Sequence, residues 1–237
     1  MVRNNSTPSS QTQALLRWMA GLGAVTADAL ARHTACTSAS ARARLAAAER
    51  AGLVERHRLL ADAPALYTVT RAALRACGAR GLQPCRVSVG GAPHAIACAG
   101  MAAALEHAYP DHTVMGEREL RRDEHDAGTP LASARLRHWT DGTEQLHRPD
   151  LVLWPRDRHG LPVAVEVELT VKAPRRLAEI CRAWARCRLV AGTIYLVAED
   201  VRQPLARAVD AAHAGERIAL VGIEALRGPE STVPVDA

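Results

Sequence analysis

The first third of the chain repeats apolar positions with a helical period and then with a strand period. Residues 11–23, 26–34 and 37–52 place apolar side chains at the three- to four-residue spacing of short helices. Either Thr37 or Ser38 is a suitable N-cap for the third of these helices. The pattern therefore predicts three short helices in succession.

Two strand-period segments follow the third helix. LVERHRLL (53–60) and ALYTVT (65–70) flank the turn sequence ADAP and predict a β-hairpin, after which residues 71–78 predict a closing helix. Three short helices followed by a hairpin is the element order of a winged helix-turn-helix, whose third helix enters the major groove of DNA. The candidate DNA-binding residues are Thr37, Ser38, Ser40, Arg42 and Arg44 on the third helix and Arg56, His57 and Arg58 on the wing.

The remainder of the chain predicts an α/β sheet. After a glycine- and proline-rich stretch, residues 95–108 predict a small-residue helix, and residues 117–122 predict a helical turn or a short strand. A strand is expected near 134–139. From Pro149 onward we expect strands at 151–155, 163–171, 193–198 and 217–223, with helices at 174–190 and 201–213.

These elements give a mixed α/β fold class with two folded parts. The predicted organisation is a disordered leader at 1–10, a winged helix-turn-helix at 11–78, a linker at 79–93, an α/β domain at 94–225 and a flexible tail at 226–237.

Charge separates the two parts. The overall charge is +5, but residues 1–80 contain 11 arginines against four acids, which gives +7, whereas residues 81–237 carry −2. A basic module joined to a near-neutral one indicates that the first part meets a polyanion. Double-stranded DNA is the expected partner, although a winged helix also serves protein contacts.

Cysteine and histidine spacing argues against a zinc site and disulfides. The six cysteines form no CxxC pair, and the ten histidines show no HxxxH or HExxH spacing. No apolar run approaches the about 20 residues that span a bilayer. We therefore expect free thiols, a cytoplasmic location and no membrane partner.

The strand predicted at 163–171 carries an unusual polar face. Its valines occupy one face, so Glu166, Glu168, Thr170 and Lys172 share the other. Asp150 begins the preceding strand, and a hairpin would bring it beside the two glutamates. Clustered carboxylates repel one another unless a cation neutralises them, and such hard oxygen ligands suit Mg²⁺ or Mn²⁺. The alternative is a solvated strand face.

These residues resemble a known nuclease pattern. Pro149-Asp150 followed by Glu166-Val167-Glu168 is similar to the PD-(D/E)xK core, in which an acid on one strand and an acid-x-lysine on the next hold a catalytic metal. More narrowly, HRPDLVLW, VAVEVELTVK and the upstream GERELRRD resemble the replication-relaxation family of actinobacterial plasmids and mobile elements. That family joins a winged helix to a nuclease-like domain.

The resemblance implies roles for individual residues. Asp150 and Glu166 would be the two metal-binding acids, with Glu168 beside them, and Glu117 or Glu119, preferably Glu119, would supply a further acid. Glu168 stands where the nuclease pattern has lysine, and Lys172, the only lysine among 29 arginines, is the candidate replacement. An ideal strand would place Lys172 about 13 Å from Glu168, so only a bulge or a bend before Pro174 would bring its head to the acids.

Several flanking residues keep alternative readings. Arg175, Arg176, Arg182 and Arg186 face either phosphate or solvent, and His147 is either a packing residue or a proton shuttle. The resemblance implies a DNA-binding protein in replication, relaxation or transfer of a mobile element, with metal-dependent nicking. The alternative is a non-catalytic regulator with a degenerate nuclease fold. Plasmid replication or transfer proteins are implied as partners, and half-site reading makes a homodimer compatible with this picture.

Overall fold

The computed structural model describes residues 9–138, 144–157 and 159–227. Within these ranges the fold is mixed α/β, with a three-stranded, a five-stranded and a two-stranded sheet. We call residues 9–79 the first unit and residues 92–227 the second unit. Most of the predicted leader and tail, and the end of the strand expected near 134–139, lie outside the described residues.

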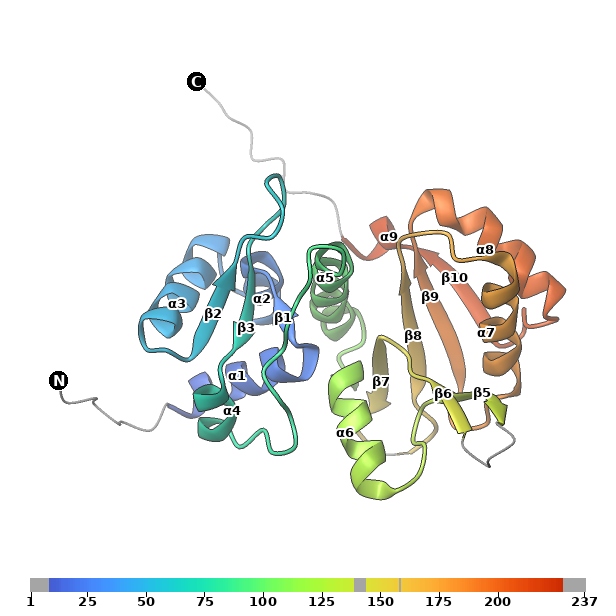
Figure 1. Ribbon diagram of the computed structural model, residues 1–237, viewed down its shortest axis with the longest axis horizontal. Coiled ribbons are helices and arrows are strands. Elements are labelled where there is room, and N and C mark those ends of the chain that lie inside the picture. The colour runs from blue at the N-terminus through green and yellow to red at the C-terminus, as the bar shows by residue number, and fades with distance from the viewer. Residues whose placement is uncertain (1–8, 139–143, 158, 228–237) are drawn as a thin grey trace.

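The first unit packs its helices against a small antiparallel sheet. The sheet has the order β1-β3-β2, and Leu16, Met19, Leu30 and Leu45 fill the core beneath it. The loop between β2 and β3 projects beyond the helices (Figure 1). The elements are α1 Ser10–Leu22, β1 Ala24–Val25, α2 Ala27–His33, α3 Ser38–Arg50, β2 Val54–His57, β3 Leu66–Val69 and α4 Arg71–Ala76.

Side-chain caps define where these helices begin. The hydroxyl of Thr26 accepts from the backbone N–H of Ala29 at 3.1 Å, and that of Thr37 accepts from Ser40 at 3.2 Å. Thr37, rather than Ser38, is therefore the cap of α3. The three helices and the hairpin agree with the sequence prediction, whereas the two-residue strand β1 was not predicted.

The second unit is built on the five-stranded sheet, with order β10-β9-β8-β7-β4. Strands β4, β7 and β8 are antiparallel neighbours, and β8, β9 and β10 run parallel. The elements are α5 Ala92–Ala108, β4 His112–Gly116, α6 Glu117–Ala127, β5 Ala134–His138, β6 Glu144–His147, β7 Leu151–Pro155, β8 Val163–Glu168, α7 Pro174–Arg186, β9 Gly192–Val197, α8 Glu199–Ala211, β10 Ile218–Gly222 and α9 Ile223–Arg227.

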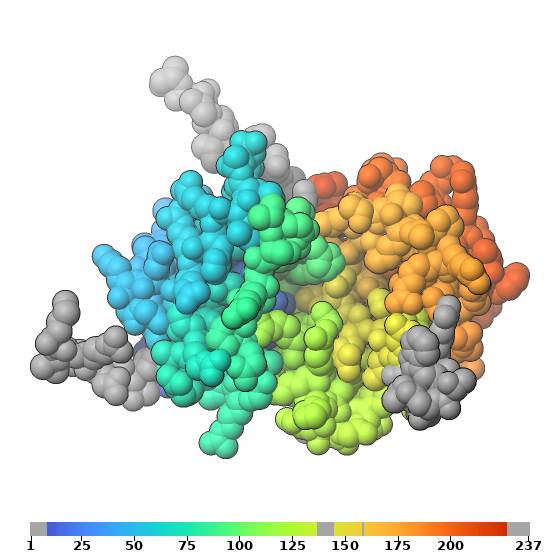
Figure 2. Space-filling view, viewed as in Figure 1, coloured from blue at the N-terminus to red at the C-terminus, as the bar shows by residue number. Residues whose placement is uncertain are grey.

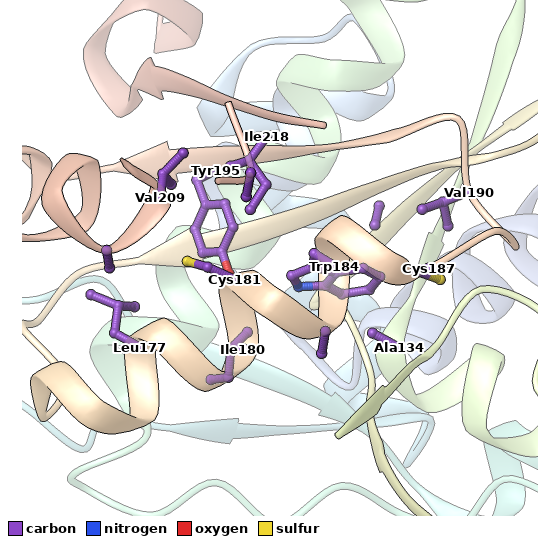
Figure 3. Packing of buried hydrophobic residues seen from close by; sticks show 14 of the residues in the cluster. Ala134, Leu177, Ile180, Cys181, Trp184, Cys187, Val190, Tyr195, Val209 and Ile218 are labelled. Atoms are coloured by element: carbon purple, nitrogen blue, oxygen red, sulfur yellow. The ribbon is translucent and has the colours of Figure 1, made fainter. Parts of the chain in front are cut away.

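Helices cover both faces of this sheet (Figure 1). Met101 and Leu105 of α5 pack on one face with Val165 and Val167 of β8. The other face packs against α7 and α8. Figure 3 shows Leu177, Ile180, Cys181 and Trp184 of α7 directed into this second core beside Tyr195.

Helix α5 also joins the two units. Ala99 packs into the core of the first unit, while Glu106 accepts hydrogen bonds from Trp18 Nε1 at 2.9 Å and pairs with His33 Nδ1 at 2.6 Å. Gly116 lies so close to α1 that a Cβ there would come within 2.5 Å of the Gly21 carbonyl oxygen. The units are therefore packed on one another, and α5, which begins at Ala92 inside the predicted linker, belongs to both cores.

Three predictions about the second unit were wrong in detail. Strand β8 ends at Glu168, not residue 171, because the chain bends at Thr170. Strands β4 and β6 were not predicted, and α6 is a full helix where a helical turn or short strand was expected. Among the described residues, no helix combines the length and apolarity needed to cross a membrane.

Candidate functional site

Strand β8 places two glutamates inside the protein. Its side chains alternate, so the valines face α5 while Glu166 and Glu168 face the α7 side of the sheet. Both are buried, with exposures of 5% and 4%. The alternative of a solvated strand face is therefore wrong, and each buried carboxylate requires a partner.

Glu166 is held by two ring nitrogens. Its Oε1 atom lies 2.8 Å from His147 Nε2 and accepts from Trp184 Nε1 at 3.0 Å. Burial raises the pKa of the Glu166 carboxyl, although the charge and hydrogen bond of His147 oppose that shift. Burial lowers the pKa of His147, but the charge of Glu166, the hydrogen bond to it and the charge of Asp150 together outweigh burial, so the net shift of this pKa is upward. The buried carboxyl and imidazole thus share one hydrogen bond.

Glu168 is paired with the single lysine of the chain. The Lys172 ammonium forms an ion pair with Glu168 Oε2, because the bend at Thr170 folds the chain back after β8. Thr170 and Lys172 are thus not part of the strand face predicted for them. The bend removes the geometric objection that an extended strand would hold the lysine head far from the acids.

Asp150 lies at the same end of the sheet. It precedes β7, and because β7 and β8 are antiparallel its carboxylate meets the end of β8. Asp150 Oδ2 accepts from the backbone N–H of Val167 at 2.8 Å, and Oδ1 lies 2.9 Å from His94 Nε2. The hydrogen bond to Asp150 raises the pKa of His94 against the effect of burial. We call Asp150, Glu166 and Glu168 the acid cluster.

Two residues of α5 that the sequence analysis did not identify adjoin the acid cluster. His94 contacts Asp150, and Cys98 Sγ lies 3.3 Å from His94 Nε2. Burial raises the pKa of the Cys98 thiol well above its usual value, and the charges of Asp150, Glu166 and Glu117 raise it further. The predicted helix began at residue 95 and left His94 out, whereas α5 begins at Ala92, and only this longer helix puts His94 and Cys98 one turn apart.

The further acid predicted as Glu119 lies elsewhere. Its carboxylate pairs with Arg122 at 3.2 Å and packs against the position of Gly21 in α1. Glu117 is closer to the acid cluster, since its backbone N–H donates to the Asp150 carbonyl at 3.0 Å and its charge acts on Cys98. The side chain of Glu117 is paired with Arg121.

The predicted DNA-binding residues lie mostly on open surface. On α3, Arg42 and Arg44 are exposed, and Arg42 lies 3.8 Å from Asp28 in a loose, exposed pair. Arg56 and Arg58 are exposed in and after β2, at the base of the projecting loop that forms the upper edge of the first unit in Figure 2. Ser38 and Ser40 are half-buried, Thr37 is engaged as the N-cap, and His57 bonds Thr68 at 2.9 Å.

The arginines at the start of α7 differ from one another. Arg175 is exposed, while Arg176 is half-buried and pairs with Glu179 at 3.0 Å. Arg182 and Arg186 are exposed. Helix α7 begins two residues after Lys172, so Arg175 is the cation of this group that lies nearest in sequence to the acid cluster.

An open groove of about 1120 Å³ lies between the 81–86 segment and α6. Its lining also includes Glu117, whose backbone bonds Asp150, so one end of the groove adjoins the acid cluster. Several of its cations already have partners, such as Arg148 with Glu124 at 2.9 Å. The arginines that line it are Arg86, Arg118, Arg121, Arg122 and Arg148.

The donor set of the acid cluster fits a hard divalent ion in part. The carboxylate oxygens of the cluster are of the kind that Mg²⁺ and Mn²⁺ prefer. Among the described residues, however, oxygens of Asp150, Glu166 and Glu168 do not all come within 4.8 Å of one another. Glu166 offers one oxygen fewer, because Oε1 is engaged by His147 and Trp184.

Protein-family models, curated proteins and solved structures were compared with the chain, and none of them matches it.

Proposed function

We propose that this protein binds duplex DNA through a winged helix-turn-helix in the first unit and cleaves a DNA phosphodiester bond in the second unit with Mg²⁺ or Mn²⁺. The observation that carries the proposal is the ion pair of Lys172 with the buried Glu168 at the end of β8, the strand whose Val167 N–H holds Asp150. Buried carboxylates beside a single lysine are uncommon in a purely structural core, where charged groups are rarely fully buried.

The topology around the acid cluster supports this proposal. Helix α5, the antiparallel strands β4, β7 and β8, helix α7 and the parallel strand β9 follow one another in the chain, and the strands lie in that order in the sheet. One acid precedes β7 and two lie on β8, which resembles the PD-(D/E)xK arrangement of an acid on one strand and acid-x-lysine on the next. The PD-(D/E)xK pattern has a lysine at the position that Glu168 occupies in this chain. Lys172, which follows the bend, would supply that positive charge instead.

The chain's own groups have distinct tasks in this reaction. The Val167 N–H and His94 fix the carboxylate of Asp150, and Lys172 limits the repulsion between Glu168 and its neighbours. A bound Mg²⁺ or Mn²⁺ would supply an activated water and neutralise charge on the phosphate. The groove lined by arginines would bring the negatively charged backbone to this end of the sheet.

Surface charge in the first unit supports DNA binding. Residues 1–80 carry +7, and Arg42, Arg44, Arg56 and Arg58 are exposed on α3 and the adjoining hairpin. Helix α3 begins at the Thr37 cap and presents its first turns at the surface, as a recognition helix must. By resemblance, the process would be replication, relaxation or transfer of a mobile element, with replication or transfer proteins as partners.

A second candidate is a non-catalytic DNA-binding regulator with a degenerate nuclease fold. The observation that favours it is the engagement of Glu166 by His147 and Trp184 in a buried setting, which leaves this acid poorly placed to bind a metal. The glutamate at the position where the nuclease pattern has lysine favours it as well.

Cleavage of supercoiled plasmid separates the two candidates. The wild-type protein is incubated with Mg²⁺ or Mn²⁺ beside an EDTA control, Asp150→Ala and the exposed control Asp210→Ala. Relaxed or linear product with wild type and Asp210→Ala, absent with Asp150→Ala and with EDTA, is the expected result. Intact DNA binding without cleavage in either metal would overturn the nuclease and leave the regulator.

A further inference from the structure

His94, Cys98 and Asp150 bring three different metal-binding atoms together. Nε2 of His94 lies 2.9 Å from Oδ1 of Asp150 and 3.3 Å from Sγ of Cys98, and the three atoms all lie within 4.8 Å of one another. Among the described residues, no other three His, Cys, Asp or Glu side chains gather their ligand atoms this closely.

The spacing follows from the local fold. His94 and Cys98 are four residues apart on α5, so they lie on one face of the helix, one turn apart. Asp150 is fixed opposite them because Oδ2 accepts from the Val167 N–H at 2.8 Å. The three donors therefore come from two rigid elements, α5 and the β7–β8 hairpin.

The distances suit tetrahedral coordination. With metal–nitrogen and metal–oxygen bonds of about 2.0 Å and a metal–sulfur bond of about 2.3 Å, tetrahedral angles separate nitrogen from oxygen by about 3.3 Å and nitrogen from sulfur by about 3.5 Å. The observed 2.9 and 3.3 Å are each a few tenths of an ångström shorter. Small side-chain rotations would admit an ion between the three atoms.

The surroundings also favour a cation. Glu117 and Glu166 place negative charge near Cys98. Near His94 the charge of Asp150 acts more strongly than that of Lys172, and Glu168 adds further negative charge. The His94 side chain is 46% exposed and that of Asp150 is 20% exposed, so solvent reaches the three atoms and can supply a fourth ligand. The site is thus open on one side and lined by protein on the other.

We propose that His94, Cys98 and Asp150 form a binding site for a borderline-soft divalent ion such as Zn²⁺, with water in the fourth position. A nitrogen, a thiolate and a single carboxylate select such ions over Mg²⁺ and Ca²⁺, which prefer oxygen ligands alone. On binding, the Cys98 thiol forms its bond to the metal through sulfur and releases its proton to solvent. The site shares only Asp150 with the acid cluster, and ion binding there does not require DNA cleavage.

Cobalt tests the proposal directly, since Co²⁺ accepts the same ligands and a cobalt–thiolate bond gives a charge-transfer absorption band. The full chain, kept reduced and free of other divalent ions, is titrated with Co²⁺ alone and then with Zn²⁺. We expect one equivalent of Co²⁺ to give the band and Zn²⁺ to abolish it. His94→Ala and Asp150→Asn should each weaken Co²⁺ binding by ~10–100-fold, at least as much as the loss of an outer-shell partner.

The cysteine variants separate this site from other thiols. Cys98→Ser should lose the band, whereas Cys36→Ser, which alters another half-buried thiol in the first unit, should keep it. Circular dichroism verifies folding, and the exposed His94→Ala serves where Cys98→Ser does not fold. Absence of the band in the wild type, its persistence in Cys98→Ser, or its loss in Cys36→Ser would overturn the proposal. Absence of plasmid cleavage would leave it untouched, because the readout is spectroscopic.

Discussion

Lys172 pairs with Glu168 across a bend in the chain, four residues beyond the end of β8. The carboxylate is buried, whereas the lysine side chain is 40% exposed. The ion pair therefore places a partly solvated ammonium group against a buried carboxylate. It also joins the end of β8 to the segment that leads into α7.

Removal of Lys172 should destabilise the protein, because the buried carboxylate of Glu168 would lose its cation. Lys172→Met leaves Glu168 buried without its cation, and we expect a loss of about 1–3 kcal/mol in the free energy of unfolding measured with urea. Lys172→Arg should lose less, because it keeps the charge. In a Glu168→Gln background the penalty of Lys172→Met should largely disappear, and equal penalties in both backgrounds would contradict the ion-pair explanation.

Replacing the two tryptophans of the second unit whose indole nitrogens are buried, Trp184 and Trp154, should change the stability of the protein by different amounts. Trp184→Phe removes the N–H that donates to Glu166, and hydrogen bonds to charged groups contribute about 1.5–3 kcal/mol. Trp154→Phe is the matched control, because its Nε1 is buried with no hydrogen-bond partner among the described residues. We expect the urea midpoint, followed by circular dichroism, to fall clearly further for Trp184→Phe. A larger fall for Trp154→Phe would show that ring volume dominates.

The approach of Gly116 to Gly21 predicts a steric effect at the junction of the units. Gly116 has φ −84° and ψ 159°, which suit any residue, so only the contact of an added Cβ with the Gly21 carbonyl opposes substitution. Gly116→Ala should destabilise by about 1–3 kcal/mol. Gly100→Ala on α5, with open space around its Cβ, should instead stabilise by up to about 1 kcal/mol. Equal melting temperatures for the two variants would contradict this packing.

The proposed binding of DNA by α3 predicts how the affinity for duplex DNA depends on salt. Each arginine–phosphate contact contributes a slope of about −0.9 to the plot of log K against log salt concentration. The double variant Arg42→Ala/Arg44→Ala should weaken duplex binding and reduce that slope by up to about 1.8, as measured by fluorescence anisotropy. Arg207→Ala, exposed on α8, should leave the slope unchanged. An unchanged slope in the double variant would place the DNA elsewhere.

The sequence predicted those parts of the fold in which apolar residues recur with a clear helix or strand period. The strand patterns of β7 and β8 were enough to predict the antiparallel pairing that brings Asp150 to the end of β8, and the apolar stripe of α7 was enough to orient that helix. The first unit followed from its caps and its hairpin. These features depend on residues close together in the chain, where pattern and structure coincide.

The remainder depends on contacts between distant segments. Strand β4 is short and half-buried, with His112 and Thr113 at its start, so its sequence lacks a clear alternation. His94 reaches Asp150 from a helix 56 residues away, which no local pattern reports. The bend at Thr170 is equally hidden, since the alternation of apolar and polar residues continues to Val171 in the sequence.

Helix α5 fixes the distance between its contact with the first unit and its contact with Asp150 of the acid cluster. Near its C-terminus Glu106 holds Trp18 and His33 of the first unit, and in its first turn His94 meets Asp150. The twelve helical steps from His94 to Glu106 span about 18 Å at 1.5 Å per residue. Under the proposed function, a duplex seated on α3 would therefore meet the acid cluster at a constant offset, and its cleavage would leave ends at a uniform position relative to the bound sequence.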